Sequence, residues 1–81
     1  MPTYRPHVLE TLAGHGLVPR PDTSPRFLRD ALNDLYRHEI RVLRDRCRAG
    51  EIPVKALAAQ VVRLRRRYLL LSLPLASWTA D

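Results

Sequence analysis

Histidine and cysteine are the side chains from which this chain would most readily build a metal or nucleophilic site, but their spacing does not favour one. His7, His15 and His38 fall in different segments, and no two are four residues apart, the spacing that places two metal ligands on one helix face. We expect these histidines to be solvated or to cap helices. Cys47, the single cysteine, falls on the predicted apolar face of a helix, where a thiol stays protonated and unreactive.

The carboxylates of the central segment are spaced for ion pairs and not for acid–base catalysis. Three aspartates stand three or four residues from an arginine, a helical spacing that contributes about 0.2–0.5 kcal/mol per pair. These pairs are Arg26 with Asp30, Asp34 with Arg37, and Arg41 with Asp45. The chain also lacks a glycine-rich phosphate loop and a nucleophile elbow. We therefore predict a protein that is not an enzyme and that uses neither a cofactor nor a metal.

Arginine is the residue type whose number does indicate a binding function. The chain holds 14 basic and 8 acidic residues, which gives a net charge of +6 and a pI near 10.7. Such a charge favours acidic partners, among them nucleic acid, anionic lipid and acidic proteins. All the basic residues except Lys55 are arginine, so the codon bias of a GC-rich genome would explain the charge equally well.

The basic residues are concentrated in two stretches of the chain. One is a stripe with spacings of three and four residues, and the other is a cluster that follows Lys55. Their members are Arg37, Arg41, Arg44 and Arg48 in the stripe, and Arg63, Arg65, Arg66 and Arg67 in the cluster. No acid occurs between Glu51 and Asp81, so the charge of the cluster is uncompensated. All of these arginines except Arg65 are candidate contacts to an anion or a nucleic acid.

Two long helices joined by a tight turn are predicted to position these arginines. The first runs over 25–49, with Ser24 as its N-cap and Gly50 as its stop. The second runs over 53–71, because Pro53 suits a first helical position. A connection this short makes the two helices antiparallel. The stripe would then lie toward the turn and the cluster toward the start of the first helix, so the arginines would be spread along the rod and not gathered in a cleft.

The two ends of the chain are predicted to form shorter elements. Residues 3–13 form a short helix with Thr3 as its N-cap and Gly14 after its last turn. The tail over 73–81 is extended, because Pro74 cannot continue the preceding helix. Neither element is long enough to be stable alone, so both must dock on the long helices.

The second long helix has more apolar surface than one neighbouring helix can cover. Its main seam alternates spacings of three and four residues and would face the first long helix. This seam consists of Val54, Leu57, Val61, Leu64, Tyr68 and Leu71. A second row, formed by Ala58, Val62 and Leu69, lies beside the seam, so the N-terminal helix, the tail or a second copy must cover it. Trp78 is predicted to be a docking anchor, within this chain or on a partner.

The predicted fold is all-α, a single domain built as an antiparallel two-helix hairpin with a short N-terminal helix. A chain of 81 residues buries only about 60% of its unfolded surface, and one cysteine cannot form a disulfide within the chain. We therefore expect two copies to form a homodimer that completes a helical bundle with two-fold symmetry. The apolar run over 68–76 is shorter than the roughly 20 residues that span a bilayer, and a lone thiol favours the cytoplasm.

Two binding functions remain open at this stage. The first is a self-associating protein-interaction module, an adaptor or accessory subunit, whose interface contains Ala58, Val62, Leu69 and Trp78. The alternative is a nucleic-acid-binding protein whose arginines contact the phosphate backbone. Against this alternative, aromatic residues do not interleave with the arginines, and the helices are too long for a helix-turn-helix motif. The regular seam therefore favours a protein partner, either a second copy or another protein.

Overall fold

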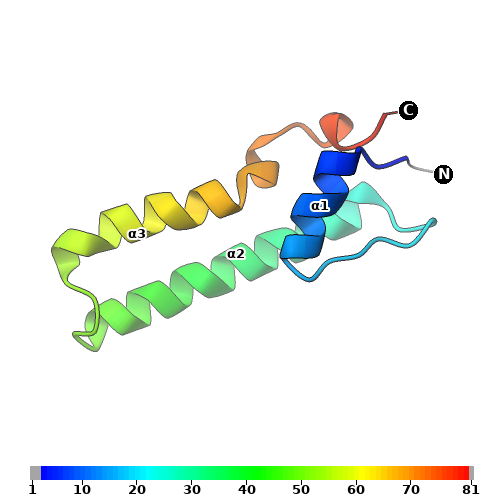
Figure 1. Cartoon of the computed structure of the whole chain (residues 1–81). Helices are drawn as coiled ribbons and strands as arrows, with labels where there is room; N and C mark the ends of the chain where they lie inside the picture. The colour runs from blue at the N-terminus through cyan, green and yellow to red at the C-terminus, as the bar shows by residue number, and fades with distance from the viewer. Residues whose placement is uncertain (1–2, 81) are drawn as a thin grey trace.

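The chain forms an antiparallel helical hairpin that is closed at one end by a short helix and by the C-terminal segment (Figure 1). A computed structural model describes residues 3–80. The elements, in chain order, are α1 (Pro6–Gly14), α2 (Pro25–Arg48), α3 (Val54–Arg67) and two 3-10 turns, η1 (Leu69–Ser72) and η2 (Leu75–Trp78). None of the described residues belongs to a strand, and extended backbone pairs only in an isolated bridge between Tyr4 and Thr79. The predicted all-α hairpin with a short N-terminal helix is confirmed.

The ends of α2 lie where the sequence places them. The Ser24 hydroxyl accepts a hydrogen bond from the backbone N–H of Phe27 at 3.2 Å, and Pro25 occupies the first helical position. At the other end Gly50 has a φ of 80°, a left-handed conformation that glycine adopts without a Cβ penalty. The Glu51 N–H then bonds the Arg46 carbonyl at 2.9 Å and closes the last turn. Both predicted boundary residues, Ser24 and Gly50, are confirmed.

The second long helix is shorter than the predicted range 53–71. Regular α-helix ends at Arg67, because Tyr68 leaves helical geometry with a φ of −115° and a ψ of 33°, and the chain tightens into η1. This change of pitch directs Leu70 into the core, where it is 4% exposed, and leaves Leu71 partly buried. The predicted seam therefore holds only from Leu57 to Tyr68, since Val54 at its start is 79% exposed.

The N-terminal segment and the tail also differ from the sequence prediction. Arg5, and not Thr3, precedes the first turn of α1, and its side chain makes no cap. The backbone of the segment pairs instead with the tail, since the Arg5 N–H bonds the Trp78 carbonyl at 3.0 Å and the Ala80 N–H bonds the Thr3 carbonyl at 2.9 Å. The tail is not extended throughout, because η2 interrupts it. Asp81, the last residue of the predicted tail, lies outside the described residues.

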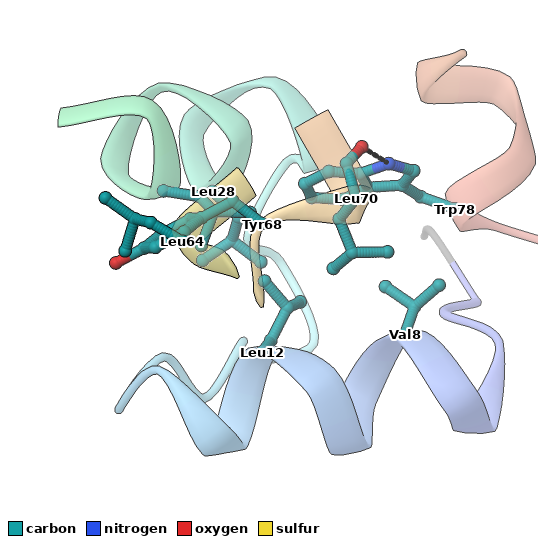
Figure 2. Close-up of a cluster of buried hydrophobic side chains, with 8 residues drawn as sticks. Val8, Leu12, Leu28, Leu64, Tyr68, Leu70 and Trp78 are labelled. Atoms are coloured by element: carbon teal, nitrogen blue, oxygen red, sulfur yellow. Dashed lines mark hydrogen bonds between the residues drawn. The ribbon is translucent and has the colours of Figure 1, made fainter. Parts of the chain in front are cut away.

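The hydrophobic core lies entirely at the end of the hairpin where α1, η1 and η2 meet the start of α2, which we call the closed end (Figure 2). Its eight buried residues are Val8, Leu12, Leu28, Leu32, Leu64, Tyr68, Leu70 and Trp78. The Trp78 ring is 0% exposed, and its Nε1 donates a hydrogen bond to the Leu70 carbonyl at 3.3 Å. Trp78 is thus an anchor within this chain. Its predicted place in an outward-facing interface is wrong, because the side chain is fully buried.

The rest of the hairpin, which we call the open end, consists of two helices and their turn. Ile52 in the turn is its one residue among the buried hydrophobics of the described chain. The molecule is consequently elongated, with extents of 47 × 17 × 16 Å and a Cα radius of gyration of 14.9 Å. A compact domain of this length would have a radius of gyration of about 12 Å.

Candidate binding groove between α2 and α3

Arginine side chains from both long helices line one side of the hairpin. The groove there has a volume of about 430 Å³ and contains four arginines and no acid. Its lining residues, which define the basic groove, are Tyr36, Arg37, Ile40, Arg41, Arg44, Val61 and Arg65. Ile40 and Val61 form an apolar floor between the two basic rims, so the groove combines apolar contact with concentrated positive charge.

The antiparallel register explains why these arginines come together. Arg37, Arg41 and Arg44 share one face of α2, because they are spaced by four and three residues. The helix α3 has 14 residues and α2 has 24, so the C-terminal turn of α3 lies beside the middle of α2. Arg65 therefore faces the same groove as Tyr36 and Arg37. The expectation that the arginines are spread along the rod and not gathered in a cleft is wrong for these four.

The other candidate anion contacts lie elsewhere on the surface. Arg48 is exposed near the turn and does not line the basic groove. Arg63 and Arg67 line a groove on the opposite side of the hairpin, and Arg66 lies on the outer face of α3. Arg65 was the one cluster member left out of the candidates, although counting back from the turn in antiparallel register would have placed it opposite Tyr36.

The groove on the opposite side of the hairpin has a mixed charge and similar size, about 420 Å³. Its residues are His38, Glu39, Val42, Leu43, Arg46, Gln60, Arg63, Leu64 and Arg67. The Glu39 carboxylate accepts a hydrogen bond from the Tyr68 hydroxyl and lies 3.7 Å from the Arg67 guanidinium. Burial, followed by the hydrogen bond and the charge of Glu39, raises the pKa of Tyr68 to about 12. Charges in this mixed groove are thus partly paired within the chain.

The ion pairs predicted along α2 are replaced by pairs with other partners. Within residues 3–80 the ion pairs are Arg46 with Glu51 at 3.1 Å and Arg67 with Glu39 at 3.7 Å. The aspartates of α2 do not take part in either pair, because exposed side chains gain little by holding one geometry in water.

The second apolar row of α3 is exposed to solvent. Val62 is 47% exposed and Leu69 is 58% exposed, and Ala58 on the same side is also exposed. The two segments of the chain that were expected to cover the row, the N-terminal helix and the tail, pack into the core at the closed end instead. Leu69 also lines a smaller, largely apolar hollow of about 250 Å³ that shares Tyr36 and Arg65 with the basic groove.

His15 fulfils a structural role at the end of α3. Its Nε2 lies 2.7 Å from the Arg67 carbonyl, and its ring centroid is 4.3 Å from that of Tyr68. The contact satisfies one of the last carbonyls of the helix, which have no partner within it. His15 therefore caps a helix, one of the two roles that the sequence analysis expected.

The metal-ligating side chains, the thiol and the lengths of the helices complete the description of residues 3–80. No group of three or more histidine, cysteine, aspartate or glutamate side chains lies close enough to hold a metal ion there. Cys47 is a free, partly buried thiol. None of the described helices is long and apolar enough to cross a membrane.

Comparisons of this chain with protein-family models, curated proteins and solved structures find no match. The surfaces of the chain itself are therefore the basis for a functional proposal.

Proposed function

We propose that this chain is a non-enzymatic helical protein-interaction module, an adaptor or accessory subunit, that binds its partner along the exposed side of α3. The observation behind the proposal is the exposed row of Ala58, Val62 and Leu69 directly beside the basic groove. Apolar side chains spaced along one helix face are the usual means of docking a second helix. A cytoplasmic location, which the lone thiol favours, belongs to the same proposal.

A second copy of the chain is one partner that would cover this row. Two elongated hairpins packed side by side about a two-fold axis would form a four-helix bundle and bury the apolar side of α3. In this form of the proposal the module acts as a homodimer.

Sedimentation equilibrium of the full chain at micromolar concentration tests self-association. The homodimer form of the proposal predicts a dimer that Val62→Asp dissociates, because the substitution places a charge on the proposed interface. Val42→Asp is the matched control, since Val42 is 41% exposed but lies on the opposite side of the hairpin. A folded chain that stays monomeric, or a dimer that Val42→Asp dissociates and Val62→Asp does not, would contradict self-association through α3.

Nucleic-acid binding is a second candidate, favoured by the four arginines that face one groove without an acid. Contacts of this kind would go to backbone phosphates and weaken steeply with salt. A gel-shift series with duplex and single-stranded DNA at 50 and about 200 mM salt measures it. The candidate predicts a salt-sensitive shift that Arg41→Glu removes, and it fails if neither DNA shifts at low salt.

A further inference from the structure

We propose that the basic groove binds an acidic amphipathic helix of a different protein, and not a second copy of this chain. The inference rests on the proposed interaction function and specifies its partner. It follows from three features of the molecule, namely the missing third helix, the charge of the groove and the arrangement of its apolar floor.

The first feature is the absence of a third packed element along most of the hairpin. Only the closed end has additional segments over α2 and α3, and there α1, η1 and η2 supply four of the eight residues of the buried cluster (Figures 1 and 2). Along the open end the two helices have a groove on each side. A helix laid in one of these grooves would complete a three-helix bundle and add a third packed element along the open end.

The second feature is charge, which disfavours a second copy in the basic groove. The side of the hairpin that bears the groove has four arginines, and α3 beyond them contributes Lys55 and Arg66 but no acid. Two copies joined groove to groove would bring twice those four arginines into one interface. Like charges placed together in an interface cost free energy and select against that partner. A partner rich in aspartate and glutamate removes the repulsion.

The third feature is the order of residues across the groove. Ile40 and Val61 form the floor, and the hollow that continues from it toward Leu69 is largely apolar. Arginines of α2 form one rim, and Arg65 of α3 forms the other. A bound helix with apolar residues at i, i+3, i+4 and i+7 would meet the floor, while acids on its two flanks would face the rims.

The dimensions fit a short helical segment. The α2 side of the groove runs from Tyr36 to Arg44, which corresponds to about 12 Å of helix at 1.5 Å per residue. A helical segment of two to three turns, roughly 8–12 residues, would cover the groove. The partner is thus a peptide-length helix or one helix of a larger protein.

The same features favour a protein over a nucleic acid. Tyr36 is the single aromatic residue of the basic groove, and its ring already packs against Tyr68 at 5.2 Å between centroids. This ring therefore already has an aromatic neighbour within the chain, whereas single-stranded nucleic acid is held by stacking on free aromatic rings. An apolar floor between basic rims also suits leucine side chains better than phosphates.

A selection from displayed helical peptides tests the inference on the full chain. The library keeps an apolar stripe at i, i+3, i+4 and i+7 and randomises every flanking position. Binding to the protein therefore selects the flanking charge. We expect aspartate and glutamate to be enriched at both flanks of the selected peptides. Fluorescence anisotropy with the winning peptide then gives Kd for the chain and its variants.

Charge-matched variants separate groove binding from general attraction to a basic protein. Arg41→Glu and Arg65→Glu, one on each rim, should each weaken binding at least ten-fold. Arg26→Glu makes the same charge change in the first turn of α2, outside the groove, and should weaken binding less than two-fold. Circular dichroism confirms that each variant is folded. Equal loss of binding in all three variants would overturn the inference.

The remaining outcomes distinguish the inference from the proposed function. Selected peptides with neutral flanks whose binding Val62→Asp abolishes would overturn the acidic partner and keep the interaction module. Peptides whose binding depends on neither Val62 nor Arg41 would contradict both. If a single-stranded or duplex DNA of 20 nucleotides displaces the peptide and binds more tightly than the peptide does, the partner is a nucleic acid and not a protein.

Discussion

The closed end and the open end of the hairpin share the same two long helices but differ sharply in burial. At the closed end eight side chains form one cluster. Four of them are 0% exposed, namely Val8, Leu12, Leu32 and Trp78. At the open end Ile52 alone belongs to the buried hydrophobics, while Val54 is 79% exposed. Buried contacts are therefore concentrated at the closed end, and the long helices leave most of their side chains exposed or only partly buried along the open end.

Replacing the central ring of the closed end is expected to have the largest effect. Trp78→Ala removes a fully buried side chain, which typically costs about 3–5 kcal/mol, a large fraction of the stability of a small domain. Urea unfolding followed by circular dichroism measures the loss. Phe27→Ala is the control, because Phe27 is 65% exposed and should change the free energy of unfolding by less than about 0.5 kcal/mol. Equal effects of the two substitutions would show that the closed end is not the core.

Truncating one buried aliphatic side chain to alanine at each end compares the two regions directly. Leu32→Ala in the cluster should cost about 2–5 kcal/mol. Ile52→Ala in the turn should cost less, because Ile52 is buried outside the cluster and its surroundings at the open end can relax into the space. The same unfolding experiment ranks the two variants, and a larger loss for Ile52→Ala would reverse the comparison.

Alkaline pH should weaken the link between the two long helices near the boundary of the two ends. The pKa of Tyr68 is raised to about 12 from its ordinary value of 10.0, first by burial and then by the hydrogen bond to Glu39. A group whose pKa is higher in the folded state contributes stability that is complete below pH 10 and is lost as the pH rises toward 12. Unfolding free energies measured between pH 9 and about 12 should fall in the natural chain and fall less in Tyr68→Phe. Parallel profiles would mean that this hydroxyl does not titrate differently in the two states.

The smallest expected effect concerns the N-cap of α2 at the closed end. Ser24→Ala removes the hydroxyl that accepts from the Phe27 N–H, which should cost about 1 kcal/mol. Ser24→Asp keeps an acceptor at the same position and should restore the stability that Ser24→Ala loses. Thermal unfolding of the three chains measures the difference, and an unchanged midpoint in Ser24→Ala would show that water replaces the cap without loss.

Local signals in the sequence predicted the parts of the fold that depend on neighbouring residues. Ser24 and Gly50 mark the ends of α2 through capping and a left-handed turn, and both are local properties. The helical break at Tyr68 has no such marker, because Leu69, Leu70 and Leu71 are equally apolar and only the position of the core decides which one is buried. Thr3 was predicted as an N-cap from its residue type alone. Its backbone pairs instead with the tail, a contact between residues far apart in sequence that no local signal marks.

The candidate site was predictable in its residue types but not in its assembly. The spacing of Arg37, Arg41 and Arg44 placed them on one helix face, and the structure keeps them together. Arg65 joins them only through the register between α2 and α3, which depends on where the turn ends and where α3 stops. The exposure of Val62 likewise depends on where α1 docks, and the sequence pattern alone does not specify that position.

The bridge between Tyr4 and Thr79 has a consequence for the order of folding. It joins residues at opposite extremes of the described chain, and the nearby side chain of Arg5 bonds the Ser77 carbonyl across 72 positions. Contacts of such long sequence separation form slowly, whereas a hairpin of adjacent helices forms from local ones. During synthesis the cluster around Trp78 cannot form until that residue has left the ribosome. A nascent hairpin would therefore expose its leucines to chaperones before the N-terminal segment pairs with the tail.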